Sequence, residues 1–155
     1  MNSDFSCLID PDSNRSLQLC DGNLLGSSSG ESYPIVKGIP RFVPQTNYAV
    51  AFGDQWNRFP KVQLDSYAGV NLSETRLARC MRGHLSKLKG KMVLEVGSGA
   101  GRFTEILLKH GAIVHSIDYS NAVDANAINN GHHENLTLVQ ADIRRIPFPK
   151  AIYDY

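Results

Sequence analysis

Three glycines at alternate positions, Gly97, Gly99 and Gly101, constrain this chain more than any other feature of its sequence. They follow a short apolar run, residues 92–96, that is typical of a buried parallel strand. Residues 103–110, which come next, carry apolar side chains at helical spacing. The stretch therefore predicts a strand, a glycine turn and a helix. Such a turn lets a ligand approach the backbone and the first N–H groups of the helix closely.

The sequence of this turn argues against a dinucleotide site. A dinucleotide-binding turn has the pattern G-x-G-x-x-G, and Arg102 occupies the position of its last glycine. Glu95 also ends the strand two residues before the first glycine, where its charge would repel a pyrophosphate. An acid at this point suits a positively charged group instead. An NAD-type oxidoreductase is therefore disfavoured.

Two further strands are predicted to end in acids. Residues 112–118 are mainly apolar and end at Asp118, 21 residues after Gly97, which is close to the interval of a ribose-binding acid. A helix is expected from Ser120 to Asn130, and the next strand, residues 136–142, ends at Asp142. Because the carboxyl ends of parallel strands meet at one edge of a sheet, these acids should surround one crevice.

The pattern E-x-G-x-G-x-G, together with Asp118 and Asp142, resembles the class I (Rossmann-like) S-adenosylmethionine-dependent methyltransferases. The resemblance implies an α/β fold with a doubly wound parallel sheet, S-adenosylmethionine as the cofactor and methyl transfer as the activity. It implies that Asp118 binds the ribose and Asp142 the adenine, and that Glu95 faces the amino end of the cofactor. The remaining implied cofactor-binding residues form the turn or bracket the adenine ring: Gly97, Ser98, Gly99, Gly101, Tyr119 and Ile143.

The resemblance assigns no catalytic residue, since the substrate-side residues of the family mostly lie beyond Tyr155. The methyl acceptor, a small molecule or a macromolecule, stays open. A second hypothesis is a cofactor-binding or interaction module without transferase activity.

Residues 1–45 are expected to form a small β-hairpin module, because turn dipeptides such as Asp-Gly separate short apolar patches. Residues 33–44 resemble the closing segment of zinc-ribbon modules that precede methyltransferase domains. Such a ribbon needs two C-x-x-C knuckles. Here Cys7 is followed three positions later by Asp10, and residues 26–29 contain no cysteine. A ribbon-like module without metal is therefore predicted.

Residues 46–90 are predicted to connect this module to a cofactor-binding half, residues 91–155. The aromatic cluster from Phe52 to Phe59 is either a lid or a helix that docks on the core. Residues 73–89 are expected to form one helix that begins with Ser73 as its cap. Its apolar stripe contains Leu77, Met81, Leu85 and Leu88, and its basic face is either solvated or a site for an anionic substrate.

The composition sets limits on location and partners. The net charge of +1 gives no reason to expect a nucleic-acid partner, and no apolar run approaches the roughly 20 residues of a membrane span. Three scattered cysteines and the absence of a signal-peptide pattern favour the cytoplasm. The neighbouring His132 and His133 lie in a polar stretch and are expected at the surface.

The sequence stops where a fourth strand of the resembled fold would begin, at residues 152–155. We therefore expect the N-terminal portion of a longer protein. In that case residues 92–96 would form an exposed strand edge, through which the chain would associate with itself. This portion by itself is expected to be inactive.

Overall fold

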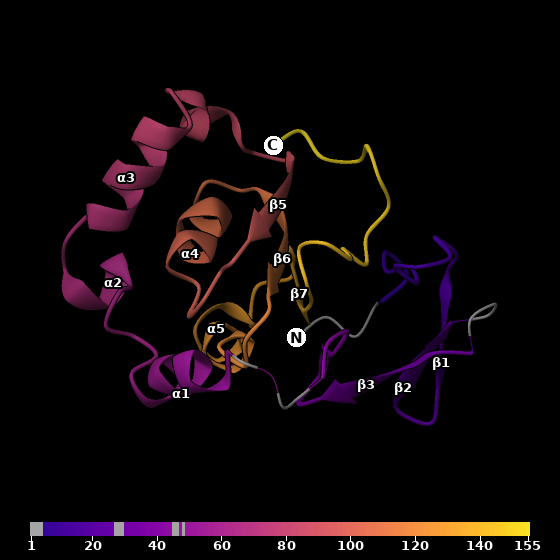
Figure 1. Ribbon diagram of the computed structural model, residues 1–155. Helices are drawn as coiled ribbons and strands as arrows, with labels where there is room; N and C mark the ends of the chain where they lie inside the picture. The colour runs from indigo at the N-terminus through magenta and orange to yellow at the C-terminus, as the bar shows by residue number, and fades with distance from the viewer. Residues whose placement is uncertain (1–4, 27–29, 45–46, 48) are drawn as a thin grey trace.

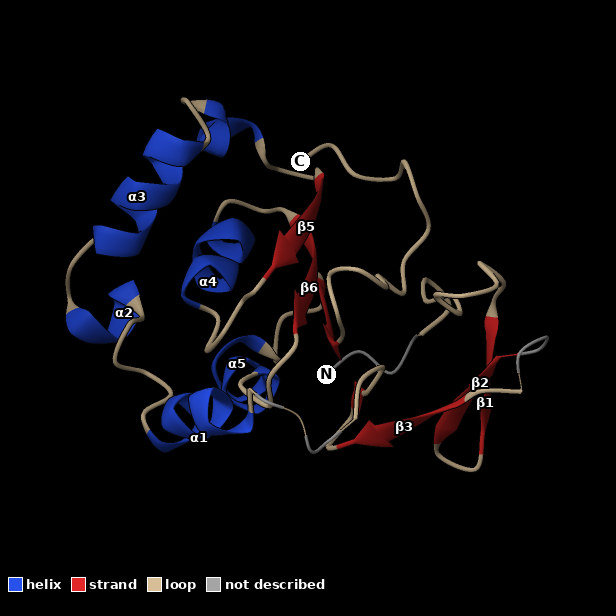
Figure 2. Ribbon diagram, viewed as in Figure 1, coloured by secondary structure: helices blue, strands red, loops and turns tan. Residues whose placement is uncertain are grey.

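The computed structural model describes residues 5–26, 30–44, 47 and 49–155. Figure 2 shows an antiparallel sheet near the N-terminus, a series of helices and a parallel sheet. The strands are β1 (Leu17–Cys20), β2 (Asn23–Gly26), β3 (Ser32–Val36), β4 (Ile39–Pro40), β5 (Met92–Val96), β6 (Ile113–Asp118) and β7 (Leu136–Gln140). The α-helices are α1 (Val50–Arg58), α2 (Asp65–Ala68), α3 (Leu72–Cys80), α4 (Arg102–Lys109) and α5 (Val123–Asn130), and a 3-10 turn, η1, spans His84–Lys87.

The parallel sheet has the order β5-β6-β7, so the predicted α/β fold class is confirmed. Side chains alternate between its two faces, and both faces are buried. Val93 and Val114 face a core that they share with α4, whereas Ile117 and Val139 face a second core. Figure 1 shows the helices on one side of this sheet and β1–β3 on the other.

The N-terminal module is a four-stranded antiparallel sheet in the order β1-β2-β3-β4. Asp21-Gly22 and Lys37-Gly38 form its two-residue turns with positive φ throughout, as a type I′ hairpin requires. The module continues onto the edge of β7, where the Phe42 N–H donates to the Gln140 carbonyl oxygen at 2.8 Å. Tyr33 and Phe42 complete the second core with Ile117 and Val139. The module therefore covers one face of the parallel sheet.

The prediction of one helix over residues 73–89 is wrong. Helix α3 ends in a Schellman motif, with bonds from Gly83 N to Ala78 O and from Arg82 N to Arg79 O. Arg82 and Gly83 adopt left-handed backbone (φ 48° and 82°), so the chain turns before η1. The predicted apolar stripe nevertheless lies in or against the first core on both sides of this break.

Ser73 is also not the helix cap, because α3 begins at Leu72 after Asn71. The carboxylate of Asp65 caps the helix instead. It accepts hydrogen bonds from the backbone N–H groups of Ser73 (2.8 Å) and Glu74 (2.9 Å). These bonds lower the pKa of Asp65 against the opposing effect of burial.

The last residues of the chain pair with the free edge of β5. The Leu94 N–H donates to the carbonyl oxygen of Tyr155 at 3.1 Å, and the Asp154 N–H donates to that of Met92 at 2.9 Å. Part of the edge that the sequence leaves exposed is thus covered from within the chain (Figure 1). The expected boundary between residues 45 and 46 lies outside the described residues. Among the helices that the structure describes, none is both long and apolar enough to span a membrane.

Candidate functional site

The carboxyl ends of β5, β6 and β7 surround a hollow of about 400 Å³. Five of the expected cofactor-binding residues line it: Gly97, Asp118, Tyr119, Asp142 and Ile143. They come from three different strand ends, which the parallel topology brings to one edge. The other four expected residues, Glu95, Ser98, Gly99 and Gly101, belong to β5 or the turn and do not line this hollow.

The glycine turn places its three glycines in left-handed backbone, and their surroundings differ. A Cβ at Gly97 would meet nothing within 4 Å, so the turn is open there. A Cβ at Gly101 would overlap the buried amides of Asn126 and Asn130. Replacement by alanine would therefore have different effects at the two positions. At Gly97 it would reduce the space for a ligand, and at Gly101 it would disturb the packing of the turn.

Asp118 fixes the turn to the end of β6. One carboxylate oxygen accepts the Gly99 N–H (2.8 Å), and the other accepts the N–H and the hydroxyl of Ser120 (2.8 and 2.7 Å). These bonds hold the nearly buried carboxylate at the wall of the hollow. Each carboxylate oxygen has two lone pairs, so the oxygen that accepts from Gly99 can accept another donor, such as a ribose hydroxyl.

Asp142 lies two residues beyond the end of β7 and is held by Arg144. The guanidinium donates to both carboxylate oxygens, the shortest bond being 2.6 Å. These hydrogen bonds lower the pKa of Asp142, so it is ionised at neutral pH. Ile143, with 61% of its surface exposed, offers an apolar face to the hollow.

Glu95 lies on the same face of β5 as Val93 and points toward α4. Its Oε2 accepts the hydroxyls of Thr104 (2.5 Å) and Ser116 (2.9 Å). Burial raises the pKa of Glu95 to about 7, although these hydrogen bonds oppose the shift. The Thr104 hydroxyl accepts in turn from Asn126, whose amide joins that of Asn130. Glu95 therefore stabilises the strand and helix on either side of the glycine turn by hydrogen bonds and does not line the hollow.

Helix α1 lies against the loop that follows Asp118. A Cβ at Gly53 would overlap the Asn121 side chain, so the two backbones are closely packed. Asn57 donates to the Asn121 carbonyl oxygen (3.0 Å), and Asn121 donates to Asp54 (2.9 Å). Polar contacts and close backbone packing thus hold this helix. Phe52 and Phe59 of the aromatic cluster are each 53% exposed.

Trp56 is a residue of this region to which the sequence assigned no separate role. Its indole nitrogen is buried and lies 3.9 Å from the position that a Cβ at Gly99 would take. Its ring packs edge-on against Phe52, with centroids 5.8 Å apart. The only feature of the sequence that points to this residue is that the aromatic cluster of residues 52–59 contains the single tryptophan of the chain.

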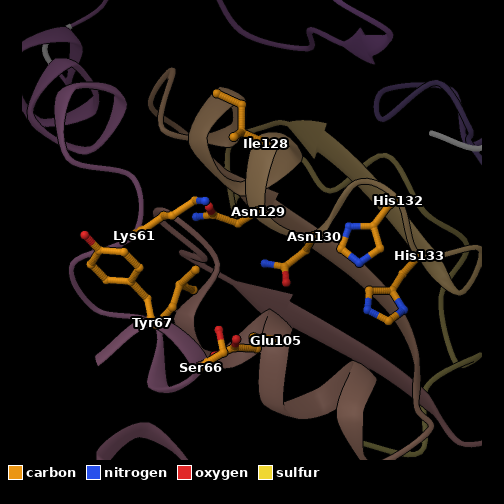
Figure 3. A pocket seen from close by; sticks show the side chains of 10 residues that line it. Lys61, Ser66, Tyr67, Glu105, Ile128, Asn129, Asn130, His132 and His133 are labelled. Carbon is orange, nitrogen blue, oxygen red and sulfur yellow. The ribbon is translucent and has the colours of Figure 1, made fainter. Parts of the chain in front are cut away.

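A second hollow, of about 470 Å³, lies between α2, α4 and the end of α5 (Figure 3). Asn129 separates it from the glycine turn and donates to the carbonyl oxygen of Ala100. His132 and His133 line its rim and are exposed, as the sequence predicts. This hollow is distinct from the crevice at the strand ends and contains none of the expected cofactor-binding residues.

Comparisons with known proteins point to the same part of the chain. Residues 94–155 match the family model described as a methyltransferase domain. Ubiquinone biosynthesis O-methyltransferase of Coxiella burnetii is 45% identical over 51 residues, which are 33% of this chain and 22% of that relative. Phosphoethanolamine N-methyltransferase 1 of Arabidopsis thaliana is 39% identical over 61 residues, which are 38% of this chain and 12% of that relative. The chain thus matches only a small part of each relative.

A solved structure shares the fold. A Methanococcus maripaludis protein, provisionally described as an S-adenosyl-L-methionine-dependent methyltransferase, superposes with a TM-score of 0.52 and 14% sequence identity. The superposition covers 73% of this chain and 51% of that protein. The chain therefore shares the fold of that protein.

Proposed function

We propose that this chain is the cofactor-binding part of an S-adenosylmethionine-dependent methyltransferase. The observation that carries the proposal is the crevice itself. A glycine turn and two acids from adjacent parallel strands border one hollow of about 400 Å³, within the residues that match the methyltransferase family model. When bound, the cofactor supplies a methyl group that is activated by a sulfonium.

The residues present fit such a cofactor. Asp118 is oriented to accept the ribose hydroxyls, and Asp142 is ionised to accept the adenine amine. Ile143 and Tyr119 line the hollow where the ring would lie, and Gly97 leaves the backbone accessible. These groups bind and orient, so their contribution to methyl transfer is to position the reacting carbon and limit access of water.

We favour a small molecule as the acceptor. The two relatives named above are an O-methyltransferase of ubiquinone biosynthesis and a methyltransferase named for phosphoethanolamine. The described residues identify no catalytic base. The alternative, a binding module that transfers no methyl group, predicts cofactor binding without formation of S-adenosylhomocysteine from S-adenosylmethionine in the presence of candidate acceptors.

Calorimetry with S-adenosylhomocysteine and NAD⁺ tests the binding proposal. We expect S-adenosylhomocysteine to bind and NAD⁺ not to bind. Asp118→Ala should weaken binding by about 1–3 kcal/mol, because the charge-assisted bonds to the ribose are lost. Glu134→Ala, at an exposed position away from the crevice, is the matched control. Preferential NAD⁺ binding, or unchanged affinity in a folded Asp118→Ala variant, would contradict the proposal.

We also propose that the N-terminal module is ribbon-like and holds no metal, and that the protein is cytoplasmic. The Asp10 carboxylate occupies the position where a knuckle cysteine would stand, and none of the three cysteines forms a disulfide bond. A chelator should leave thermal unfolding unchanged, whereas a structural zinc site would make unfolding chelator-sensitive. Self-association through the β5 edge stays a prediction that light scattering can test.

A further inference from the structure

Buried polar atoms without hydrogen-bond partners gather around the glycine turn. Buried polar groups are nearly always paired in proteins, so such a group needs an explanation. Among the described residues, one such atom, Ser13 Oγ, lies in the N-terminal module. The others lie on the turn or on the strand, helices and loop beside it: Trp56 Nε1, Asn57 Oδ1, Glu95 Oε1, Ser98 Oγ, Arg102 Nε, Asn121 Oδ1 and Asn129 Oδ1. This distribution is expected where a polar ligand or bound water completes the site.

Trp56 is the most informative of these residues because its indole nitrogen can only donate. The contacts of Gly53 and Asn57 with Asn121 hold α1 in place, and Phe52 supports the indole ring from its edge. The buried nitrogen lies beside Gly99. The donor is thus held at the backbone of the turn without an acceptor in the described part of the chain.

The surroundings favour an anionic acceptor. The turn leads directly into the N-terminus of α4, where the helix dipole and backbone N–H groups attract negative charge. Ser98, on the turn itself, contributes a buried hydroxyl that also has no partner among the described residues. The adenosine-binding acids lie on the other side, at the ends of β6 and β7. A cofactor with its nucleoside there would place its amino-acid end toward the turn.

We propose that Trp56 is a positioning residue whose indole N–H donates to the carboxylate at the amino-acid end of the cofactor. This inference rests on the proposed function and extends the binding site from the parallel sheet to α1. The aromatic cluster of residues 52–59 then contributes to the site through one polar atom. A methyl donor anchored at both its nucleoside and its amino-acid end is held in one orientation.

Two ligands separate this role from general packing. S-adenosylhomocysteine carries the amino-acid end, whereas 5′-methylthioadenosine has the same nucleoside and sulfur without it. Trp56→Phe keeps an aromatic ring and removes the N–H donor. We expect it to weaken S-adenosylhomocysteine binding about tenfold in calorimetry, the typical effect of a lost bond to a charged group. Its affinity for 5′-methylthioadenosine should change less than twofold.

Phe59→Leu is the matched control, since this half-exposed aromatic ends the same segment and its ring has no contact with the turn among those described. The wild-type protein gives a second readout that needs no variant. Trp56 is the only tryptophan, so its fluorescence reports this position alone. Emission should shift with S-adenosylhomocysteine and change little with 5′-methylthioadenosine.

Equal losses of both ligands in a folded Trp56→Phe variant would overturn the inference and show a packing role. Unchanged binding of both would overturn it too, since water would then satisfy the indole. In both cases the proposed function survives because the wild-type protein still binds. Failure of the wild-type protein to bind either ligand would overturn the proposed function and this inference together.

Discussion

Two turns of this protein are organised by a buried carboxylate, and only one of them is open to a ligand. In the N-terminal module, Asp10 is fully buried and accepts the backbone N–H groups of Asp12 (2.9 Å) and Ser13 (3.3 Å). The hydroxyl of Tyr33 donates to the same carboxylate oxygen at 3.4 Å. In the parallel sheet, Asp118 accepts the N–H of Gly99 in the same manner but lines a hollow.

The difference lies in what surrounds each acid. Around Asp10, burial and the neighbouring carboxylates raise the pKa of Tyr33 to about 12, so its hydroxyl remains a neutral donor at physiological pH. Around Asp118, several buried polar atoms have no partner within the described chain, whereas a single such atom, Ser13 Oγ, lies at the Asp10 turn. A carboxylate that holds a turn is therefore not a sign of a binding site by itself. The incomplete hydrogen bonding around it is the more specific sign.

The largest effect is expected at the open turn, residues 97–101. Substitutions there should distinguish Gly101, which is packed inside the protein, from Gly97, which faces open space. Gly101→Ala places a Cβ against Asn126 and Asn130, which are buried and hydrogen-bonded to each other. We expect about 4 kcal/mol loss of unfolding free energy from overpacking and backbone strain. Urea denaturation measures it.

Gly97→Ala is the matched control, because its φ of 77° is similar to the 88° of Gly101 while the space around it is empty. It should cost about 1 kcal/mol of strain and weaken S-adenosylhomocysteine binding more than folding. Equal losses of stability in the two variants would show that packing at Gly101 is not what distinguishes them.

Disruption of the closed turn, which Asp10 holds through Asp12 and Ser13, should lower stability without changing ligand affinity. Asp10→Ala leaves two backbone N–H groups and the Tyr33 hydroxyl without their acceptor. We expect about 3 kcal/mol loss of unfolding free energy, measured by urea denaturation, from these unsatisfied buried donors. Affinity for S-adenosylhomocysteine in the folded variant should stay the same. A selective loss of affinity would show that the two turns are coupled through the core that β3 shares with β6 and β7.

The parallel half of the fold was predictable because its signals are local. Each strand is a short apolar run, and the glycines and acids that follow mark its end. The break at Arg82-Gly83 was missed because the apolar spacing continues across it, from Met81 to Leu85, although a glycine stood at the break. The capping of α3 by Asp65 joins two separate helices and leaves no local pattern.

The candidate site divides in the same way. Asp118 and Asp142 were predictable because topology alone brings strand ends together. The orientation of Glu95 also had a signal, since alternation along β5 places it on the same face as Val93. The contribution of Trp56 depends on how α1 docks against Asn121, a tertiary contact that no spacing encodes.

Glu95 offers a pH test of the polar network under the open turn. Its pKa of about 7 in the folded protein exceeds the ordinary value of 4.5, so the folded state binds a proton more tightly than the unfolded state. The stabilising contribution is fully present below pH 4.5 and is lost as the pH rises through 7. Between pH 5.5 and 8 the loss should be about 2 kcal/mol.

Glu95→Gln should remove this dependence, as seen in the difference between the two proteins in urea unfolding at each pH. The comparison is needed because burial lowers the pKa of His115 to about 4, which makes stability rise over the same range in both proteins. An unchanged pH profile in the variant would mean that Glu95 stays ionised in the folded protein.

The smallest effect is expected at two adjacent arginines, one at the open crevice and the other beside the closed turn. Arg144 pairs with Asp142 at the open crevice, whereas Arg145 pairs with Asp12 beside the closed turn. The Arg144 side chain is 82% exposed, and exposed ion pairs contribute about 1 kcal/mol or less. The backbone N–H of Arg144 also donates to Asp142 Oδ1 at 2.8 Å, so Asp142 keeps a hydrogen bond to this residue when the guanidinium is removed.

Arg144→Ala should therefore change S-adenosylhomocysteine affinity by less than about threefold, with a smaller difference at higher salt. Arg145→Ala, the matched control, should leave affinity unchanged. A tenfold loss confined to Arg144→Ala would mean that this guanidinium holds Asp142 in its binding orientation. The open site would then depend on a side-chain ion pair at its rim, whereas the closed turn is held by backbone N–H groups.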